Sequence, residues 1–258
     1  MSNHYNLPES FETKFEHYHV PKQFKNWLLL SDLHVPYHSI RALTEALDYG
    51  TGKGVDAIML NGDAMDCYQL SKFNPDPRKR SVKDELEAMR ELLGVLGNIA
   101  PVFYKLGNHE ERLERLLIVK APMFLGCAEF EIETLLRCGE KNVTVIKDQR
   151  IVYIGRLPVL HGHEVRLANV VVNPARSLFL KTKKTAICGH LHRTSQHNET
   201  ALDGKLISTW STGHLGEEHP EYARINGWNH GCARVEVDND GNFEVINLRI
   251  QGNKLFRS

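Results

Sequence analysis

Five short clusters of aspartate, asparagine and histidine recur along this chain of 258 residues, and each follows a short apolar run. In order they are Asp32-Leu33-His34, Gly62-Asp63-Ala64-Met65-Asp66, Gly107-Asn108-His109-Glu110, His161-Gly162-His163 and Gly189-His190-Leu191-His192. Carboxylate, amide and imidazole ligands without thiolates suit Mn²⁺, Fe or Zn²⁺ better than Ca²⁺ or a structural Cys-type zinc site. Each cluster alone resembles an ordinary turn or helix cap, but five in succession predict one centre that holds two divalent ions.

The spacing inside the clusters predicts different roles for their members. Side chains two residues apart in an extended segment point the same way, so Asp32 and His34 can bind one ion. The two His-x-His pairs follow the same rule. Asp63 can bridge two ions through its two carboxylate oxygens. Asn108 supplies a neutral oxygen, whereas the adjacent His109 cannot easily bind the same ion and is left free to act as an acid.

The elements that must position the clusters follow from the apolar pattern. Continuous apolar runs predict three buried strands in the first half, at Trp27–Ser31, Ala57–Leu60 and Pro101–Leu106. Helices are predicted between these strands, over Arg41–Tyr49 and from a capping signal at Ser81 and Asp84 onward. A third helix is predicted after the third cluster, with an inner face formed by Leu113, Leu116 and Leu117.

The second half of the chain reads mostly as short β runs. These are Val143–Ile146, Ile151–Ile154, Pro158–Leu160, Thr185–Cys188, Leu206–Thr209, Ala233–Val237 and Phe243–Leu248. The last residues, 251–258, look like a frayed end. We therefore expect two sheets in contact, flanked by helices, with ligands gathered at the carboxyl ends of strands. The five clusters stand at those ends.

Composition narrows the class of protein. The chain is 41% hydrophobic and 25% charged, and its 32 lysines and arginines balance 32 aspartates and glutamates, so net charge gives no reason to expect nucleic acid or a membrane. Five cysteines without a C-x-x-C pair argue against a disulfide framework and favour a reducing, cytoplasmic setting. No segment has the pattern of a signal peptide or of a membrane span.

Taken together, the clusters resemble the signature of the calcineurin-like metallophosphoesterase superfamily, which reads D-x-H, G-D-x-x-D, G-N-H-[ED], a lone H and G-H-x-H. The resemblance spans about residues 28–192. It implies an α/β fold, a four-layer α/β/β/α sandwich of two mixed sheets flanked by helices. Residues 1–258 would form a single metallophosphoesterase domain, with 1–25 as an N-terminal extension and 193–258 as the β-rich completion of the sandwich.

The resemblance also implies a role for each matching residue. One metal ion would be held by Asp32, His34, Asp63 and His192, and the other by Asp63, Asn108, His161 and His190. His161 is preferred to His163 because the ligand in this family directly follows its strand. His109 would be the general acid, with Asp66 orienting its imidazole. The implied cofactors are two divalent ions, with Mn²⁺ ahead of Fe or Zn²⁺.

The implied reaction is hydrolysis of a phosphoester by a hydroxide that two metal ions activate. A phosphodiester of a nucleotide or of nucleic acid, such as DNA, is favoured, because compact bacterial and phage proteins with this layout resemble DNA-repair exonucleases or phosphodiesterases. Protein phosphatases of the superfamily carry Arg-Gly where this chain has Cys67-Tyr68, which argues against that substrate class. Two alternatives stay open, a phosphomonoesterase and a catalytically silent scaffold, although scaffolds typically lose ligands that are all present here. Oligomeric state is not predicted.

Several residues outside the ligand set are candidates for contacts with substrate. They are His163, Arg78, Trp228 and His230. Two basic stretches, Lys72 with Arg78–Arg80 and Arg176 with Lys181–Lys184, would track a nucleic-acid backbone or would be solvated loops. The polar and aromatic segment Tyr222–Cys232, together with His214, would fold over the metal centre or form a packed turn between strands.

Overall fold

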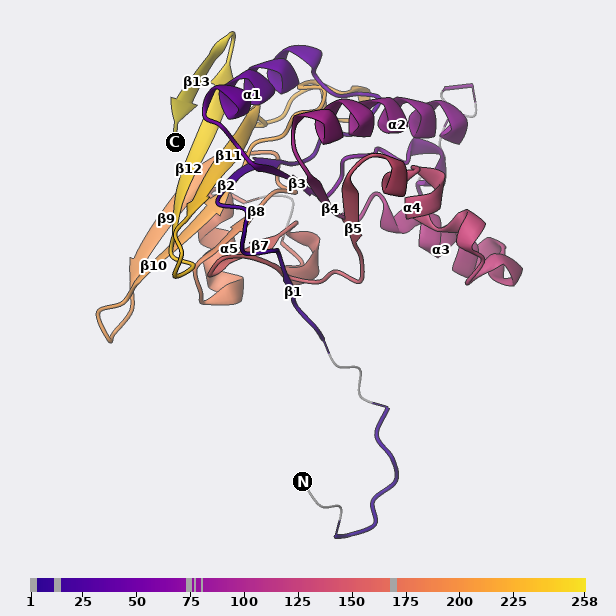
Figure 1. Cartoon of the computed structure of the whole chain (residues 1–258), viewed down its shortest axis with the longest axis horizontal. Helices are drawn as coiled ribbons and strands as arrows, with labels where there is room; N and C mark the ends of the chain where they lie inside the picture. Colours follow the sequence, from indigo (N-terminus) through magenta and orange to yellow (C-terminus); the bar gives the residue numbers. More distant parts are fainter. Residues whose placement is uncertain (1–3, 12–14, 73–75, 77, 80, 168–170) are drawn as a thin grey trace.

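Two sheets lie face to face with helices on their outer sides in a computed structural model of the chain (Figure 1). The structure describes residues 4–11, 15–72, 76, 78–79, 81–167 and 171–258. Within these residues one sheet has seven strands, in the order β13 (Lys254–Arg257), β12 (Phe243–Gln251), β11 (Gly231–Val237), β2 (Asn26–Leu30), β3 (Ala57–Asn61), β4 (Val102–Lys105) and β5 (Val143–Ile146). The other has six, in the order β1 (Tyr18–His19), β6 (Val152–Ile154), β7 (Leu157–Leu160), β8 (Ala186–Cys188), β10 (Leu206–Ser211) and β9 (Ser195–Thr200).

Both sheets are mixed. Strands β2 to β5 pair in parallel, while β11, β12 and β13 extend the same sheet in antiparallel fashion. In the second sheet β7, β8 and β10 are parallel neighbours, and β6 and β9 pair antiparallel at either side of them. The strands predicted at the first three apolar runs are therefore present, and they are adjacent.

Helices complete the layers. The described α-helices are α1 (Ile40–Gly52), α2 (Val82–Ile99), α3 (Glu111–Lys120), α4 (Ile132–Leu135) and α5 (Pro174–Thr182). Short 3₁₀ turns connect them: η1 (Tyr68–Leu70), η2 (Pro122–Phe124), η3 (Ala128–Phe130), η4 (Cys138–Glu140), η5 (His163–Val165) and η6 (Glu221–Ala223). In Figure 1, α1 and α2 lie on one side of the molecule and α5 on the other. None of the described helices combines the length and the apolar composition that a bilayer crossing requires.

Side-chain alternation along β2 explains why the sheets stack. Trp27 and Leu29 point into the core between the sheets, where they meet residues of the second sheet such as Val159 and Ile187. Leu28 and Leu30 point the other way, into the core beneath α1 and α2. Successive residues of a strand face opposite sides, so a continuous apolar run indicates a strand buried on both faces. The predicted four-layer α/β/β/α sandwich is confirmed.

Helix α2 begins as the sequence predicts. The side chain of Ser81 accepts a hydrogen bond from the Asp84 backbone N–H, and the Asp84 carboxylate accepts one from the backbone N–H of Ser81, which completes a capping box. Met89, Leu93 and Leu96 are buried on the inner side of this helix. Their helical spacing explains why this side of α2 packs against the core.

Two segments predicted to be irregular are regular instead. In the second basic stretch, Arg176 and Lys181 lie in α5, and Lys183 and Lys184 follow its end. The N-terminus of α5 is capped by Asn173 and has Pro174 in the first turn, which is a helix signal in the sequence. The supposed frayed end forms the hairpin of β12 and β13 around Gly252, which has a φ of +60°. The Gly-Asn pair at 252–253 is a two-residue turn signal. The predicted N-terminal extension also contributes β1, which pairs with β6.

Helix α3 departs from its predicted packing. Leu113 and Leu117 are only half-buried, and Leu116 is 39% exposed, so the expected inner face is not enclosed. The first two leucines line a cavity of about 440 Å³ between α3 and the segment around Phe130. Helical spacing places these leucines on one side of the helix but does not provide an element to cover them.

Candidate metal centre

The five clusters meet because of how the strands are paired. The first three follow β2, β3 and β4, which run in parallel, and the last two follow β7 and β8, which also run in parallel. Parallel strands end at the same edge of a sheet, so each group of loops gathers at one edge. The hydrogen bond from the Asn61 side-chain amide to the carbonyl of Leu160, at 2.8 Å, joins the two edges.

The ligand positions share an uncommon backbone conformation. Asp32, His34, Asp63, His190 and His192 have φ values of 55°, 52°, 50°, 68° and 54°. Residues other than glycine adopt the left-handed region infrequently, at about 1–3 kcal/mol each, and such residues concentrate at functional sites. Five of the seven predicted ligands are therefore held in a conformation that the surrounding structure must impose.

Two glycines in the clusters are required by close approach. A Cβ at position 107 would lie 2.3 Å from Oδ1 of Asp63, and a Cβ at position 189 would lie 1.9 Å from Oγ of Ser31. Both distances are shorter than any side-chain carbon tolerates. The glycine that precedes the ligand in each of these clusters thus lets the loops from different strands touch.

The first ligand group consists of Asp32, His34 and His192, all buried. Nε2 of His192 lies 3.3 Å from Oδ1 of Asp32 and 3.2 Å from Nε2 of His34. Oδ2 of Asp32 is already occupied, since it accepts hydrogen bonds from Ser31 Oγ at 2.5 Å and from the His190 backbone N–H at 2.9 Å. Three donor atoms therefore converge on one point, with one carboxylate oxygen aimed at it.

The second ligand group consists of Asp63, His161 and His190. Nε2 of His161 lies 3.2 Å from Oδ2 of Asp63, and its Nδ1 lies 2.8 Å from the carbonyl of Asn61, which orients the ring. Asn108 contributes a buried Oδ1 that has no hydrogen-bond partner among the described residues. His163, the alternative to His161, instead places Nε2 3.0 Å from Glu111.

The charges of the centre suit cations. Burial disfavours ionisation of Asp63, but His109 and His161 outweigh it and hold the pKa of Asp63 well below its usual range. Burial likewise opposes charge on His161, yet Asp63 and Asp32 raise its pKa to about 10. Burial, with the nearby charge of His161, lowers the pKa of His190 to about 4, so this imidazole is neutral near pH 7 and available as a ligand.

Unpartnered donor atoms test whether the residues fit a metal centre. Within the described ranges, buried atoms without a hydrogen-bond partner include Asp32 Oδ1, Asn108 Oδ1, His161 Nε2 and His190 Nδ1. Most buried polar atoms in proteins are paired. Carboxylate, amide and imidazole atoms left open in one place fit divalent ions of the Mn²⁺, Fe or Zn²⁺ class.

The predicted acid lies beside both groups. Nδ1 of His109 lies 2.7 Å from the carbonyl oxygen of Asp66 and 3.4 Å from its carboxylate. The same carboxylate lies 3.1 Å from Nδ1 of His34. Asp66 thus orients two imidazoles, and it holds His109 more closely through its main chain than through the side chain on which the prediction relied.

Glu110 holds the second and third clusters together, a role that the sequence did not suggest. Its carboxylate accepts hydrogen bonds from the backbone N–H groups of Asp63, Met65 and Gly107 at 3.1, 2.8 and 2.7 Å. The hydroxyl of Tyr104 donates a fourth at 2.7 Å. The only signal in the sequence is the acidic residue that closes the third cluster.

A buried ion pair supports the His161 loop from the other side. Lys105 is fully buried, and its Nζ lies 2.8 Å from Glu164, whose carboxylate accepts hydrogen bonds from the backbone N–H groups of His161 and Gly162. Burial opposes ionisation of Glu164, but Lys105, His163 and His161 lower its pKa to about 2. Apolar strand β4 gave no reason to expect a buried lysine.

Replacing Lys105 with methionine should therefore destabilise the fold, because it leaves the buried Glu164 charge without its lysine partner. We expect the free energy of unfolding at pH 7, measured with urea, to fall by about 3–5 kcal/mol. Lys83→Met is the matched control: Lys83 pairs with Glu87 at 3.7 Å on the exposed face of α2 and should change stability far less.

The same pair predicts the sign of a pH effect. The pKa of Glu164 falls from an ordinary 4.5 to about 2 on folding, so the pair stabilises the protein fully above pH 4.5 and loses this effect as pH falls toward 2. The difference in unfolding free energy between wild type and Lys105→Met should narrow over that range. A difference that stays constant from pH 6 to pH 2.5 would contradict this assignment.

The residues predicted to contact substrate lie in different surroundings in the structure. Arg78 is exposed and pairs with Asp76 at 2.8 Å, and the neighbouring Lys79 pairs with Glu221, while Arg80 lies outside the described residues. Trp228 lies edge-on to His192, with ring centroids 4.4 Å apart, so its segment does reach the ligand group. His230 is buried, with Nε2 2.9 Å from the carbonyl of Gly216.

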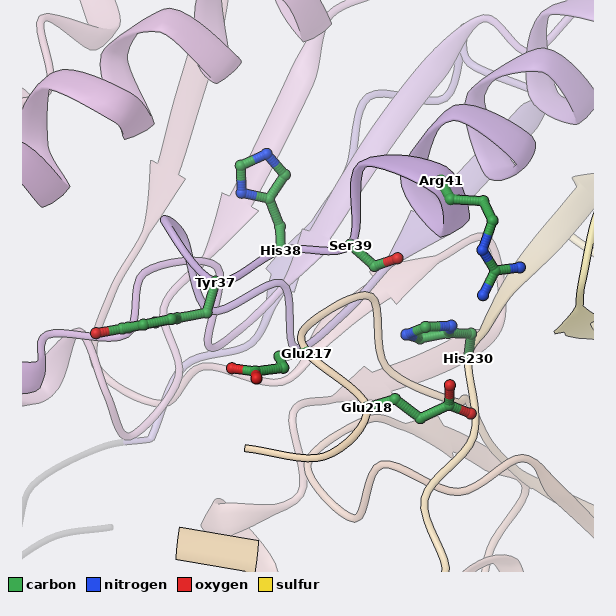
Figure 2. Close-up of a pocket in the computed structure, with 7 residues that line it drawn as sticks. All are labelled: Tyr37, His38, Ser39, Arg41, Glu217, Glu218 and His230. Atoms are coloured by element: carbon green, nitrogen blue, oxygen red, sulfur yellow. The ribbon is translucent and has the colours of Figure 1, made fainter. Parts of the chain in front are cut away.

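His230 also lines a cavity of about 420 Å³ beside the start of α1. Figure 2 shows Arg41, His230 and Glu218 on one side of it and Tyr37 on the opposite side, with the ring of His38 pointing away from Glu218. The ring of His214 connects the cavity wall to the ligands. Its centroid lies 5.0 Å from that of His230, which lines the cavity, and 4.9 Å from that of the ligand His192, on which it stacks.

Comparison with known proteins places this geometry in context. A Vps29 variant from Entamoeba histolytica is similar in structure, with a TM-score of 0.48 at 14% identity over 90% of this chain and 98% of that one. A dimetal phosphatase from Danio rerio has a TM-score of 0.46 at 12% identity, over 90% of this chain and 97% of that one. The phosphoesterase Yfce from E. coli has a TM-score of 0.41 at 14% identity, over 86% of this chain and 98% of that one. A search of curated proteins gives no match. The family model of the calcineurin-like phosphoesterase superfamily domain matches residues 26–221, which contain all five clusters.

Proposed function

Because the chain belongs to the calcineurin-like phosphoesterase superfamily, we propose that it is a dinuclear metal-dependent phosphohydrolase that cleaves a phosphodiester of a nucleotide or nucleic acid. One observation carries the proposal: two groups of largely buried ligands adjoin, with Nε2 of His161 4.0 Å from Oδ1 of Asp32, and leave donor atoms of both without partners. The proposed ligands are Asp32, His34, Asp63 and His192 for one ion and Asp63, Asn108, His161 and His190 for the other. Mn²⁺ is the proposed metal.

The chain's own residues supply the remaining chemistry. When bound, two divalent ions provide charge that polarises a phosphoryl group and lowers the pKa of a water. Nδ1 of His109 donates to the carbonyl of Asp66, and Nε2 accepts a hydrogen bond from Nη2 of Arg112 at 2.8 Å. Nε2 is therefore the nitrogen that gives a proton to the leaving oxygen once it is protonated and released from Arg112. This tautomer is assigned from the hydrogen-bond partners. Asp66 also fixes the ring of His34.

The ligand set favours an enzyme over a scaffold on the same fold. A scaffold has no need to keep two carboxylates and four imidazoles together in a largely buried site, which disfavours folding unless cations compensate. The five cysteines are free thiols, four of them buried, which supports the proposal of a reducing, cytoplasmic setting.

Hydrolysis of bis-p-nitrophenyl phosphate beside p-nitrophenyl phosphate tests the proposed function. We expect Mn²⁺ to stimulate cleavage of both by the metal-loaded protein, with the diester cleaved at the higher kcat/KM, and chelation to abolish both activities. Faster cleavage of the monoester would keep the chemistry but overturn the substrate class. A folded protein with both sites filled that cleaves neither compound would overturn the enzyme assignment in favour of a scaffold.

A further inference from the structure

Arg112 lies in the first turn of α3, three residues after the proposed acid, and its guanidinium is fixed in place. Nη1 donates to the carbonyl of Asp66 at 2.9 Å and to that of Cys67 at 3.3 Å. Nη2 lies 2.8 Å from Nε2 of His109. The side chain therefore bridges the second and third clusters and ends at the rim of the metal centre.

The guanidinium of Arg112 forms no direct ion pair with a carboxylate among the described residues. Across the part of the chain that the structure describes, no carboxylate oxygen lies within 4.0 Å of the nitrogens of Arg112. A guanidinium has five N–H groups, and the three contacts described use two on Nη1 and one on Nη2. The second N–H of Nη2 and the N–H of Nε are left over. The side chain of Arg112 is half-buried, and it presents its positive charge and two spare N–H donors to the space beside His109.

We propose that Arg112 binds a non-bridging oxygen of the substrate phosphoryl group, an inference that rests on the phosphohydrolase function proposed above. The two spare N–H groups form a planar fork that suits phosphate oxygens. The carbonyls of Asp66 and Cys67 hold the fork in position before substrate arrives, so little side-chain freedom is lost on binding. Arg112 thereby places the leaving oxygen next to His109 and stabilises charge that develops on the phosphoryl group.

Binding of inorganic phosphate to the Mn²⁺-loaded protein, measured by calorimetry, tests this without requiring turnover. Arg112→Gln should weaken phosphate binding by about 10- to 100-fold, because a charge-assisted pair of hydrogen bonds is lost. Arg112→Lys should restore part of the affinity, because it keeps the charge but loses the fork. Arg115→Gln is the matched control, since Arg115 is exposed on the same helix and should leave phosphate affinity and activity unchanged.

Metal content and kinetics separate substrate binding from a structural role. Arg112→Gln should retain both ions, while KM for bis-p-nitrophenyl phosphate rises by the same factor as the phosphate dissociation constant. Unchanged phosphate affinity in Arg112→Gln overturns the inference whether or not the wild type is active. Weaker affinity that accompanies lost metal, and that lysine does not restore, overturns it as well. An inactive wild type whose phosphate affinity still depends on Arg112 overturns the proposed function but keeps the anion site.

Discussion

A His109→Gln variant is expected to keep both metal ions and to lose about 10²- to 10⁴-fold of its kcat toward a diester with an alkyl leaving group. The ring lies between the carbonyl of Asp66 and the rim of the centre, where Nε2 can protonate the departing oxygen. The metal loops should survive the change, because the closest contact of residue 109 with Asp63 is its backbone N–H, at 2.9 Å from Oδ1, which glutamine retains, whereas the ring Nε2 lies 3.8 Å from Oδ2.

Leaving-group dependence makes this prediction specific. p-Nitrophenolate departs without protonation, so His109→Gln should lose much less activity toward bis-p-nitrophenyl phosphate than toward an alkyl diester. Metal per chain, determined on the same preparations, is the control for an intact centre. Equal losses toward both substrates with both ions present would remove His109 from the role of general acid.

Replacing Asp63 with asparagine is expected to have the second large effect, which is loss of both ions. Oδ2 of Asp63 lies 3.2 Å from His161 in the second ligand group, and its charge also acts on His34 in the first. Changes outside the ligand shell typically cost about 10–100-fold in metal affinity, so removal of a shared carboxylate should cost more at each site. Hydrolysis should fall to the level of the chelated protein.

Titration with Mn²⁺ by calorimetry measures this effect. Asp240→Asn, a change of the same chemistry in an exposed turn, is the control and should bind two ions as wild type does. Backbone contacts of Asp63 to Glu110 persist in the variant, so the loop itself should remain folded. If Asp63→Asn lost one ion and kept the other at full affinity, Asp63 would be a ligand of a single site and not the bridge.

The sequence was most informative where local pattern and burial coincide. Strand β2 was predicted because Trp27–Leu30 is apolar on both faces, and the structure buries both. Helix α2 was predicted with its cap because Ser81 and Asp84 act within one turn. Leu116 in α3 was misplaced because spacing along a helix does not reveal whether another element covers it.

The candidate centre likewise contains residues that the sequence could predict and residues that it could not. Residue types and spacing predicted one centre and paired Asp32 with His34, the family resemblance added His192 to that pair, and the structure places the three together. The supporting contacts of Lys105 and Arg112 could not be predicted, because each depends on which loops from distant strands become neighbours. Such contacts follow from sheet order, which no local pattern in this chain encodes.

Anomalous diffraction at the manganese edge, from crystals of the full chain grown with Mn²⁺, tests the central claim most directly. The account predicts two peaks at the carboxyl edges of the sheets, one against Asp32, His34 and His192 and one against Asn108, His161 and His190, with Asp63 contacting both. A single peak, or peaks away from these residues, would contradict a dinuclear centre.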